Sequence, residues 1–339
     1  MKAAVLRQRK QPLEIEEVDR PVPAVDEVLI RIDACGACHS DVHVADGDWT
    51  QLAAIIKQPL ILGHEIAGHI VETGSEVRDL QIGDHVGVPW IHWSCGECEF
   101  CSSGHENLCL RQKITGVTVD GGYAEFVKAP AAHVVRIPGG LSSVETAPLL
   151  CAGLTVYRAL EHAGPLAGQR LAVFGIGGLG HLAVQLGKIW GAEITAIDVS
   201  DAKLALAAAM GASRLLNAAS ANVVKELRSR GGVHVCLVTS GAKAAYDMAF
   251  YCLRPTGTLL VVGLPAENIC FPPILMTARE IKVQASAVGT RRDMQEVLAL
   301  AAAGKLRCQV ESRRLSQVNQ VFDELRHGRA TARIVLTPQ

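Results

Sequence analysis

Residues 171–198, LAVFGIGGLGHLAVQLGKIWGAEITAID, decide the fold class of this chain. The apolar run LAVF leads into the pattern G-x-G-x-x-G at Gly175, Gly177 and Gly180, and a stretch with helical apolar periodicity follows. The next apolar run ends at Asp198, which is 198 − 175 = 23 positions after the first glycine. A strand, a glycine turn, a helix and a second strand with a terminal acid predict a dinucleotide-binding βαβ unit.

The glycines have a specific physical use in such a unit. Without side chains they let the backbone approach a pyrophosphate, whose charge is favoured by the free N–H groups at a helix N-terminus. Asp198 is expected to accept hydrogen bonds from a ribose diol and to repel a 2′-phosphate, and the residues VS that follow supply no arginine for one. The pattern therefore predicts NAD rather than NADP. A βα turn whose glycines are purely structural is the alternative.

The alternation of strand-like and helical stretches extends over residues 154–290. Such alternation is typical of a parallel sheet covered by helices. The strand-like runs lie at 170–175, 193–198, 233–238, 257–263 and 280–286, and the helical stretches lie at 180–190, 201–211 and 242–253.

The rest of the chain has a different texture. Residues 1–153 read as short β segments separated by turn residues, with long loops that carry most of the cysteines and histidines. Residues 291–339 contain two helical stretches and a final strand-like segment. A length of 339 residues also favours two domains.

Composition excludes several classes of protein. The 33 Lys and Arg nearly balance the 34 Asp and Glu, so there is no basic field for nucleic acid or anionic lipid. The N-terminal MKAAVLRQRK lacks the apolar core of a secretory signal, and no apolar run approaches the ~18 residues that span a bilayer. We therefore expect a cytoplasmic protein. In that reducing compartment the eleven cysteines, six of them between 35 and 109, favour metal or catalytic sites over disulfides.

One cysteine group has the spacing of a metal site by itself. Thiols in the pattern C-x2-C-x2-C-x7-C can reach the corners of a tetrahedron around one ion, which suits zinc or an iron–sulfur cluster. In the bacterial pattern for iron–sulfur clusters, three residues separate the third cysteine from the last, and a proline follows. Here seven residues separate Cys101 from Cys109, and Leu110 follows, which favours zinc. Four protein ligands leave no position for a substrate, so this site is expected to be structural; unliganded core thiols are the alternative. Its residues are Cys95, Cys98, Cys101 and Cys109.

A second metal site needs residues from three separate segments. These are CGACHSDVH at 35–43, GHE at 63–65 and LLCAGLTVY at 149–157. A catalytic zinc ion takes three protein ligands and keeps one open position, and Cys35, His64 and Cys151 would form such a site from two thiols and one imidazole. Sequence spacing cannot assemble these residues, and each of them taken singly is more often part of a core. We assign no metal role to Cys38.

These segments together resemble the zinc-dependent medium-chain alcohol dehydrogenases. CGACHSDVH, GHEIAGHIVETG, GDHVGV, the four-cysteine lobe, GGYAEFV, GIGGLGHLAVQ and the terminal RIVL occur in the order of that family along essentially the whole chain. The resemblance is closest to the compact bacterial and yeast-type branch. It implies a GroES-like β-rich catalytic domain at 1–153, an inserted Rossmann domain with a doubly wound parallel sheet at 154–290, and a return to the first domain at 291–339. It also implies an active site between the domains and a homotetramer.

The resemblance further implies roles for individual residues. Cys35, His64 and Cys151 would bind the catalytic zinc, and the four-cysteine lobe would bind a structural zinc. Glu65 would lie beside the catalytic metal, either as a residue that supports the ligands or as a transient ligand during exchange of water and substrate. The other implied catalytic residues are Asp41, which orients the metal-binding histidine, Ser40, which contacts the alcohol, and His43, which passes the proton to solvent.

Further residues are implied to hold the cofactor and to shape the substrate pocket. Trp49 and Trp90 fall where bulky residues narrow the alcohol pocket, with ordinary packing as the alternative; a solvated loop position is the corresponding alternative for His43. The implied cofactor contacts are Gly175, Gly177, Gly178, Leu179, Gly180, Asp198, Lys203, His39 and Arg333.

The expected activity is the NAD-linked oxidation of short primary alcohols to aldehydes, and the reverse reduction, by hydride transfer from a zinc-bound alkoxide. Two zinc ions per chain and a small-molecule alcohol or aldehyde are the expected ligands, with no nucleic-acid or membrane partner. One alternative is a zinc enzyme of the same fold that acts on another alcohol, a polyol or an aldehyde adduct. A non-catalytic zinc- and NAD-binding redox sensor is a further alternative.

Overall fold

The computed structural model describes residues 1–338, which form two compact units. The first unit comprises Met1–Cys151, Thr290–Gly304 and Cys308–Gln339, and the second comprises Ala152–Gly289 and Lys305–Arg307. The expected boundaries at 153 and 290 lie within two residues of these. Lys305–Arg307, which we expected in the C-terminal return, group with the second unit instead. The reason is that the Gln185 side chain binds both backbone groups of Arg307, at 2.8 and 2.9 Å.

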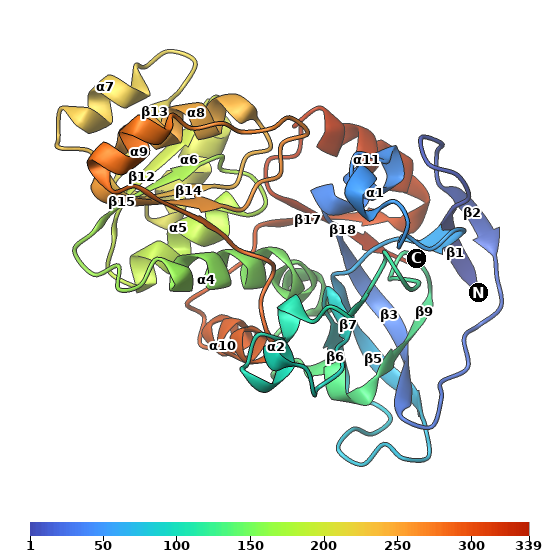
Figure 1. The fold of residues 1–339 in the computed structure, drawn as a ribbon. Helices are drawn as coiled ribbons and strands as arrows, with labels where there is room; N and C mark the ends of the chain where they lie inside the picture. Colours follow the sequence, from blue (N-terminus) through green and yellow to red (C-terminus); the bar gives the residue numbers. More distant parts are fainter. Residues whose placement is uncertain (339) are drawn as a thin grey trace. The chain divides into compact units, whose positions relative to one another are not determined.

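The second unit is built on a six-stranded sheet in the order β13-β12-β11-β14-β15-β16 (Figure 1). All of its strand pairs are parallel, and the order is that of a doubly wound dinucleotide-binding fold, which confirms the predicted fold class. The strands are β11 (Arg170–Phe174), β12 (Glu193–Asp198), β13 (Arg214–Asn217), β14 (Val233–Val238), β15 (Leu253–Val261) and β16 (Lys282–Ala285).

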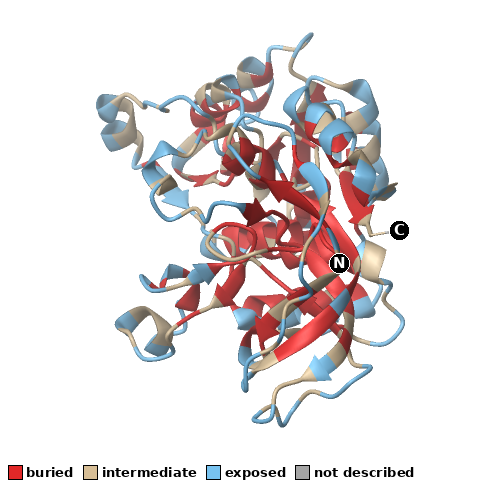
Figure 2. Cartoon of the chain, turned by 90° about the vertical axis from the view of Figure 1, so that its right-hand side faces the viewer, coloured by how far each residue is buried: buried red, intermediate tan, exposed pale blue. Residues whose placement is uncertain are grey.

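Helices cover this sheet in two groups. The helices α4, α5 and α6 pack on one another, and α7 packs on α8, which contacts β14 and β15. The central strands β11, β12 and β14 are apolar on both faces because both are covered, and Figure 2 shows buried residues concentrated along the strands. The helices are α4 (Ala152–His162), α5 (Gly180–Ile189), α6 (Asp201–Met210), α7 (Val223–Arg228), α8 (Lys243–Cys252) and α9 (Pro273–Arg279).

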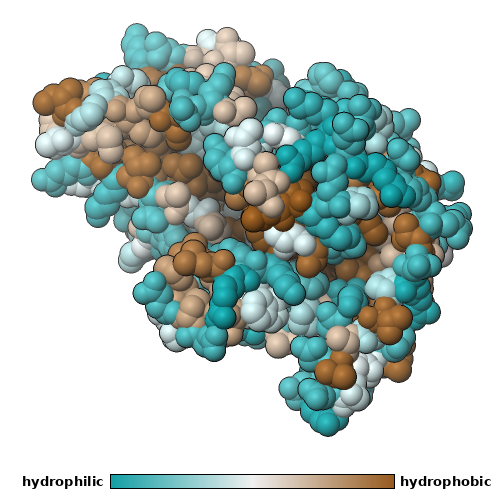
Figure 3. All heavy atoms as spheres, turned by 45° about the vertical axis from the view of Figure 1, so that its right-hand side comes forward, coloured by the Kyte–Doolittle hydropathy of each residue, from teal (hydrophilic) through white to brown (hydrophobic). Residues whose placement is uncertain are grey.

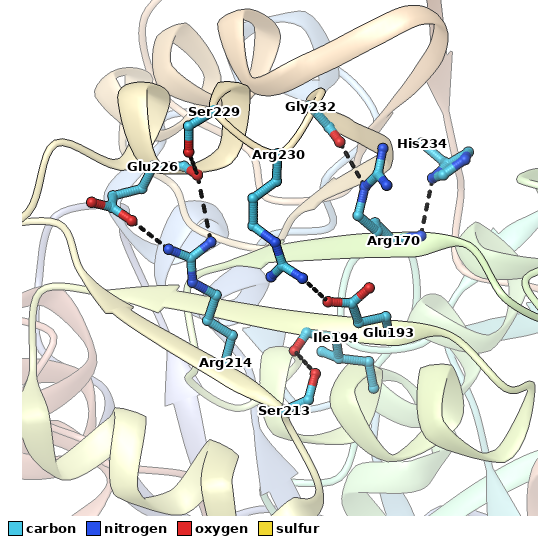
Figure 4. A network of polar contacts seen from close by, with 10 residues as sticks. All are labelled: Arg170, Glu193, Ile194, Ser213, Arg214, Glu226, Ser229, Arg230, Gly232 and His234. Carbon is cyan, nitrogen blue, oxygen red and sulfur yellow. Dashed lines mark hydrogen bonds and ion pairs between the residues drawn. The ribbon is translucent and has the colours of Figure 1, made fainter.

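A network of polar contacts lies at the N-terminal ends of β11, β12 and β14 (Figure 4). Arg170 donates through Nε to the carbonyl of Gly232 at 2.8 Å, and its backbone N–H donates to Nδ1 of His234 at 3.0 Å. Arg230 donates to Glu193 at 2.9 Å. These contacts lie at the N-terminal ends of the strands, whereas the glycine turn follows β11 at the C-terminal ends, where open parallel sheets bind their ligands.

The first unit is built mainly from antiparallel strands. Its largest sheet runs β10-β6-β5-β3-β18-β17, with β9 also paired to β3. The C-terminal strand β18 pairs with β3, placing Leu336 opposite Cys35, so the last segment completes this sheet. The strands are β1 (Lys2–Leu6), β2 (Glu14–Glu17), β3 (Glu27–Ala37), β4 (Leu60–Ile61), β5 (Ile66–Thr73), β6 (His85–Val88), β7 (Ile91–Trp93), β8 (Lys113–Ile114), β9 (Phe126–Pro130), β10 (Val135–Arg136), β17 (Val310–Arg314) and β18 (Arg333–Thr337).

Short helices surround these sheets. The core of this unit is mostly aliphatic and also includes Tyr123 and Phe322. The face in Figure 3 shows a largely hydrophilic surface with separate apolar patches. In the described part of the chain no helix has the length and apolar character to cross a membrane. The helices are α1 (His39–Asp46), α2 (Glu99–Ser102), α3 (Ser143–Thr146), α10 (Arg291–Ala302) and α11 (Val318–Arg326), with 3-10 turns η1 (Thr50–Leu52), η2 (Glu106–Leu108), η3 (Ala131–His133), η4 (Ala147–Leu150) and η5 (Leu315–Gln317).

Candidate metal centres and cofactor turn

Four thiols of the first unit converge around the short elements α2 and η2. The sulfur atoms of Cys95, Cys98, Cys101 and Cys109 lie within 4.8 Å of one another. Backbone N–H groups point at two of these sulfurs, with Cys98 donating to Cys95 at 3.4 Å and Cys95 donating to Cys109 at 3.5 Å. Such donation, first of all from the backbone of Glu97, lowers the pKa of the Cys95 thiol to about 6, whereas desolvation raises that of Cys101 to about 11. The set fits a tetrahedral zinc site with four thiolate ligands.

A second group of metal-ligating side chains is fully buried in the same unit. The ligand atoms of Cys38, His64, Glu65 and Cys151 lie within 4.8 Å of one another. Two thiols and one imidazole form the ligand set of a catalytic zinc site, with the carboxylate beside it. A hydrogen bond between the two thiols lowers the pKa of Cys38 and raises that of Cys151.

Cys35 does not belong to this group, and the assignment of Cys35 as a ligand is therefore corrected to Cys38. Cys35 lies inside β3, and its sulfur packs against two glycines, where a Cβ on either Gly63 or Gly122 would come within 2.8 Å of it. The strand β3 ends at Ala37, and Cys38 follows as the N-cap residue of α1. The turn from strand to helix, rather than the strand itself, carries a thiol to His64 and Cys151.

Asp41 organises the buried group from its position in the first turn of α1. Its carboxylate accepts hydrogen bonds from the backbone N–H of Cys38 at 2.9 Å and of Gly63 at 3.2 Å, and from the hydroxyl of Tyr123 at 2.8 Å. Its Oδ1 lies 3.1 Å from Nδ1 of His64. Desolvation lowers the pKa of His64, but the charge and hydrogen bonding of Asp41 and of Cys38 together outweigh that effect and raise it.

This arrangement leaves the second ring nitrogen of His64 for a ligand. Within residues 1–338 both ring nitrogens of His64 are buried without a hydrogen bond of normal geometry, but Nδ1 faces the Asp41 carboxylate whereas Nε2 does not. A buried polar atom without a partner is rare, and an ion in this position would satisfy it. The role predicted for Asp41, to orient the metal-binding histidine, is compatible with these contacts. The contribution of Tyr123 was not foreseen, because it comes from a strand-free segment 82 residues away.

Glu65 forms a buried ion pair with Arg333 of β18. Both side chains are almost inaccessible, at 0% and 4% exposure, and Oε2 of Glu65 has no partner among the described residues. Burial raises the pKa of Glu65 to about 7, and the guanidinium opposes that rise. Gly36 is required here, since a Cβ would lie 1.8 Å from Oε2. Contact of Arg333 with the cofactor pyrophosphate stays a prediction; the contact seen is with Glu65.

Aromatic rings connect the buried group to the end of α1. The His64 ring meets Trp90 edge-on at 4.7 Å, Trp90 lies 6.4 Å from Trp49, and Trp49 stacks on His43 at 5.4 Å. His43 contacts Oδ2 of Asp48 through Nδ1 at 2.7 Å, a partner that the sequence did not suggest. Ser40 and His39 lie in the first turn of the same helix.

The glycine turn of the second unit has the expected form. Gly175 adopts a φ of 91°, which side chains disfavour. A Cβ on Gly180 would lie 1.9 Å from the carbonyl oxygen of Gly175, so the turn requires glycine at both positions. A Cβ on Gly177 would meet nothing within 4 Å, so the space next to this residue is open. The carboxylate of Asp198 accepts from the backbone of Ile176 at 2.7 Å.

The remaining predicted cofactor contacts flank this turn. Gly178 and Leu179 are half-buried immediately before α5, and Lys203 is half-buried in the first turn of α6. The helix α5 begins at Gly180, directly after these residues, and a helix N-terminus favours an anion. The geometry fits a pyrophosphate at Gly177 and a ribose at Asp198.

Comparisons with known proteins identify the family. Residues 24–139 match the family model for the alcohol dehydrogenase GroES-like domain, and residues 178–303 match the model for zinc-binding dehydrogenases. An alcohol dehydrogenase of Geobacillus stearothermophilus is 45% identical over 99% of this chain and 98% of its own length. One of Rhizobium meliloti is 42% identical with the same coverage.

Solved structures give the same result. The alcohol dehydrogenase of Aeropyrum pernix superposes with a TM-score of 0.94 at 36% identity and covers 100% of both chains. An acetophenone reductase of Geotrichum candidum, solved in complex with NAD, superposes with a TM-score of 0.90 at 28% identity, over 99% of this chain and 96% of its own. The chain therefore belongs to the zinc-dependent medium-chain alcohol dehydrogenase family and is an NAD-dependent zinc alcohol dehydrogenase.

Proposed function

We propose that this enzyme oxidises short primary alcohols to aldehydes with NAD as the hydride acceptor, and that it also catalyses the reverse reduction. The observation that carries the proposal is the buried group of Cys38, His64 and Cys151, whose histidine is held by Asp41 and presents an unpartnered Nε2. A zinc ion held by these three residues would supply a Lewis acid that lowers the pKa of an alcohol hydroxyl. The four-cysteine lobe would hold a second, structural zinc ion in each chain.

The chain's own residues would move the proton from the alcohol to solvent. Ser40 lies in the first turn of α1 beside the buried group, and His43 lies one turn further on. With Nδ1 of His43 facing the Asp48 carboxylate at 2.7 Å, that nitrogen carries the proton and Nε2 remains free to exchange another. We infer that Ser40 passes the proton toward His43 and that Asp48 fixes the ring for this task.

Trp49 and Trp90 support a small substrate. Their indole rings lie 6.4 Å apart, and Trp90 contacts the His64 ring, so two bulky side chains stand next to the buried group. Short unbranched alcohols fit beside such rings more readily than branched or cyclic ones. Glu65, paired with Arg333, would be the adjacent carboxylate that exchanges with water and substrate.

The support for NAD comes from the second unit. The open space at Gly177 and the helix N-terminus suit the pyrophosphate, and the Asp198 carboxylate disfavours a 2′-phosphate. Nicotinamide chemistry requires that the reacting carbon be held in line and kept dry, which is a task of positioning.

A substrate panel tests this proposal. The ratio kcat/KM should be highest for ethanol, 1-propanol and 1-butanol, and lower for 2-propanol, cyclohexanol and sorbitol. Trp90→Ala should raise kcat/KM for cyclohexanol relative to 1-propanol, and Trp93→Ala, at a tryptophan for which we propose no pocket role, should leave that ratio unchanged. A preference of the unmodified enzyme for sorbitol or cyclohexanol would replace the primary-alcohol assignment with that of another zinc dehydrogenase of this fold.

We also propose a homotetramer in the cytoplasm. The strand β16 pairs only with β15 among the described residues, and all four of its residues are exposed, so its free edge is suited to pairing with a second copy. The eleven cysteines are all free thiols, which suits a reducing compartment. Light scattering on purified protein measures the assembly: a mass of four chains supports the proposal, and a monomer contradicts it.

A further inference from the structure

The first unit contains a third group of potential metal ligands, which has no part in the proposed reaction. Asp33, His69 and His85 offer ligand atoms that lie within 4.8 Å of one another. We call these three residues the strand triad, because Asp33 comes from β3, His69 from β5 and His85 from β6. The other two groups use entirely different residues.

The strand register explains why these side chains meet. His69 and His85 are direct cross-strand partners in the antiparallel pair β5–β6, and their rings stack at 4.7 Å with an interplanar angle of 10°. Asp33 is the extra residue of a β-bulge, at which the register of β3 against β5 shifts between Ile32 and Ala34. A bulge bends its strand and re-aims a side chain, so the carboxylate joins the histidine pair.

Hydrogen bonds already link the three side chains through a serine. Oδ2 of Asp33 lies 2.7 Å from Nδ1 of His69 and accepts from the hydroxyl of Ser143 at 3.0 Å. The same hydroxyl lies 2.8 Å from Nε2 of His85. The guanidinium of Arg31, 3.7 Å from Asp33, opposes a cation, but its side chain is 58% exposed and free to turn away.

We propose that the strand triad binds a third divalent ion of the zinc class, with two imidazoles and one carboxylate as its ligands. Imidazole nitrogen and carboxylate oxygen are ligands of zinc, copper and nickel, whereas magnesium and calcium require shells built of oxygen. Metal–ligand bonds of ~2.0–2.2 Å place the ligand atoms of a tetrahedral site ~3.3–3.6 Å apart. The three ligand atoms here already lie within 4.8 Å of one another, so small side-chain rotations would bring them to that spacing. A water molecule held by Ser143 would complete the shell.

The exposure of the triad determines how such an ion behaves. The side chains of His69 and Asp33 are 38% and 27% exposed, so an ion enters from solvent and exchanges more readily than in the buried group. Bound there, it joins three adjacent strands and the first residue of α3. Because the unfolded chain does not hold this geometry, an ion that binds the native state raises the melting temperature.

Metal stoichiometry tests the proposal. Untagged enzyme that already holds its tightly bound zinc is dialysed against micromolar zinc chloride at pH 7.5, and zinc per chain is measured by mass spectrometry. The unmodified protein should take up one more ion per chain than the double variant His69→Gln, His85→Gln. His327→Gln is a matched control, since His327 is an exposed histidine 3.1 Å from a carboxylate, Asp323, without a third ligand nearby in the described structure. That control should take up the full amount.

Equal zinc uptake by the unmodified protein and the double variant overturns the proposal. A second measurement covers the case in which the double variant does not fold. In crystals of unmodified enzyme equilibrated with zinc, anomalous scattering at the zinc edge should show a peak among Asp33, His69 and His85. The absence of that peak, with peaks present elsewhere in the molecule, also overturns it. Both readouts are independent of alcohol turnover, so the proposed function can fail without affecting them.

Discussion

Replacing Cys38 or Cys35 by alanine distinguishes the roles of these two thiols, which lie three residues apart at the N-cap of α1 and inside β3. The Cys38 sulfur belongs to the group within 4.8 Å of His64 and Cys151, whereas the Cys35 sulfur packs against glycine backbone. Loss of a residue that merely supports a metal ligand lowers metal affinity ~10–100-fold, so loss of a ligand itself should exceed ~100-fold. Cys38→Ala should therefore reduce bound zinc from two ions per chain to one and reduce turnover below ~1%.

The Cys35→Ala variant is the matched control. Removal of one buried sulfur leaves a small void and should lower the free energy of unfolding by about 1–2 kcal/mol, with zinc content and turnover retained. Zinc per chain is measured by mass spectrometry after exhaustive dialysis, and stability by urea denaturation of the same samples. Two zinc ions in Cys38→Ala together with one in Cys35→Ala would refute the reassignment of the ligand.

Three further predictions concern the proton path, acid stability and cofactor choice. Asp48→Asn removes the carboxylate facing His43. It should lower kcat at neutral pH, by less than the ~100-fold that loss of an acid–base residue itself would cause, and should change the pH profile of kcat. A pH profile identical to that of the unmodified enzyme would contradict this prediction. Burial lowers the pKa of His133 to about 4, and its Nε2 accepts from the backbone N–H of Ser94 at 3.0 Å. In the unfolded chain the same imidazole takes up a proton near pH ~6.5. The contribution of His133 to the free energy of unfolding is therefore complete above that pH, and up to ~3 kcal/mol of it is lost as the pH falls toward 4. Urea denaturation across this range should show a shallower pH dependence in His133→Gln, and an unchanged slope would exclude the effect. Asp198→Ala should lower the preference for NAD over NADP in kcat/KM ~10–100-fold, and a constant ratio would show that the carboxylate does not select the cofactor.

The fold class was predictable because its signals are local and repeated. The glycine pattern at 175–180 and the alternation of apolar runs over 154–290 depend only on neighbouring residues, and the six-stranded parallel sheet confirms them. The strand β13 escaped notice because it has four residues, of which only Leu216 is buried. A strand that short has too few apolar positions for its period to be read.

The metal sites were predictable only in part. The four thiols of the cysteine lobe come from 15 consecutive residues, 95–109, and the structure brings them together. The choice between Cys35 and Cys38 depends on the residue at which β3 ends and α1 begins, and sequence patterns fix such boundaries only to within a few residues. That uncertainty is as large as the distance between the two candidates.

Long-range partners could not be predicted from spacing at all. Tyr123 reaches Asp41, and Arg333 reaches Glu65 from 268 residues away, because β18 returns to pair with β3. The strand triad depends likewise on register and on a bulge, neither of which leaves a mark in the order of residues. Such contacts are properties of the assembled sheet.

The most direct test of the account measures NADH formation from NAD and 1-propanol as zinc is removed and restored. A chelator should first extract one zinc ion per chain with the loss of turnover, and addition of zinc chloride should restore both together. Turnover should follow occupancy of the group formed by Cys38, His64 and Cys151. Full turnover after that ion has been removed, with the protein still folded, would contradict the claim that this group carries the reaction.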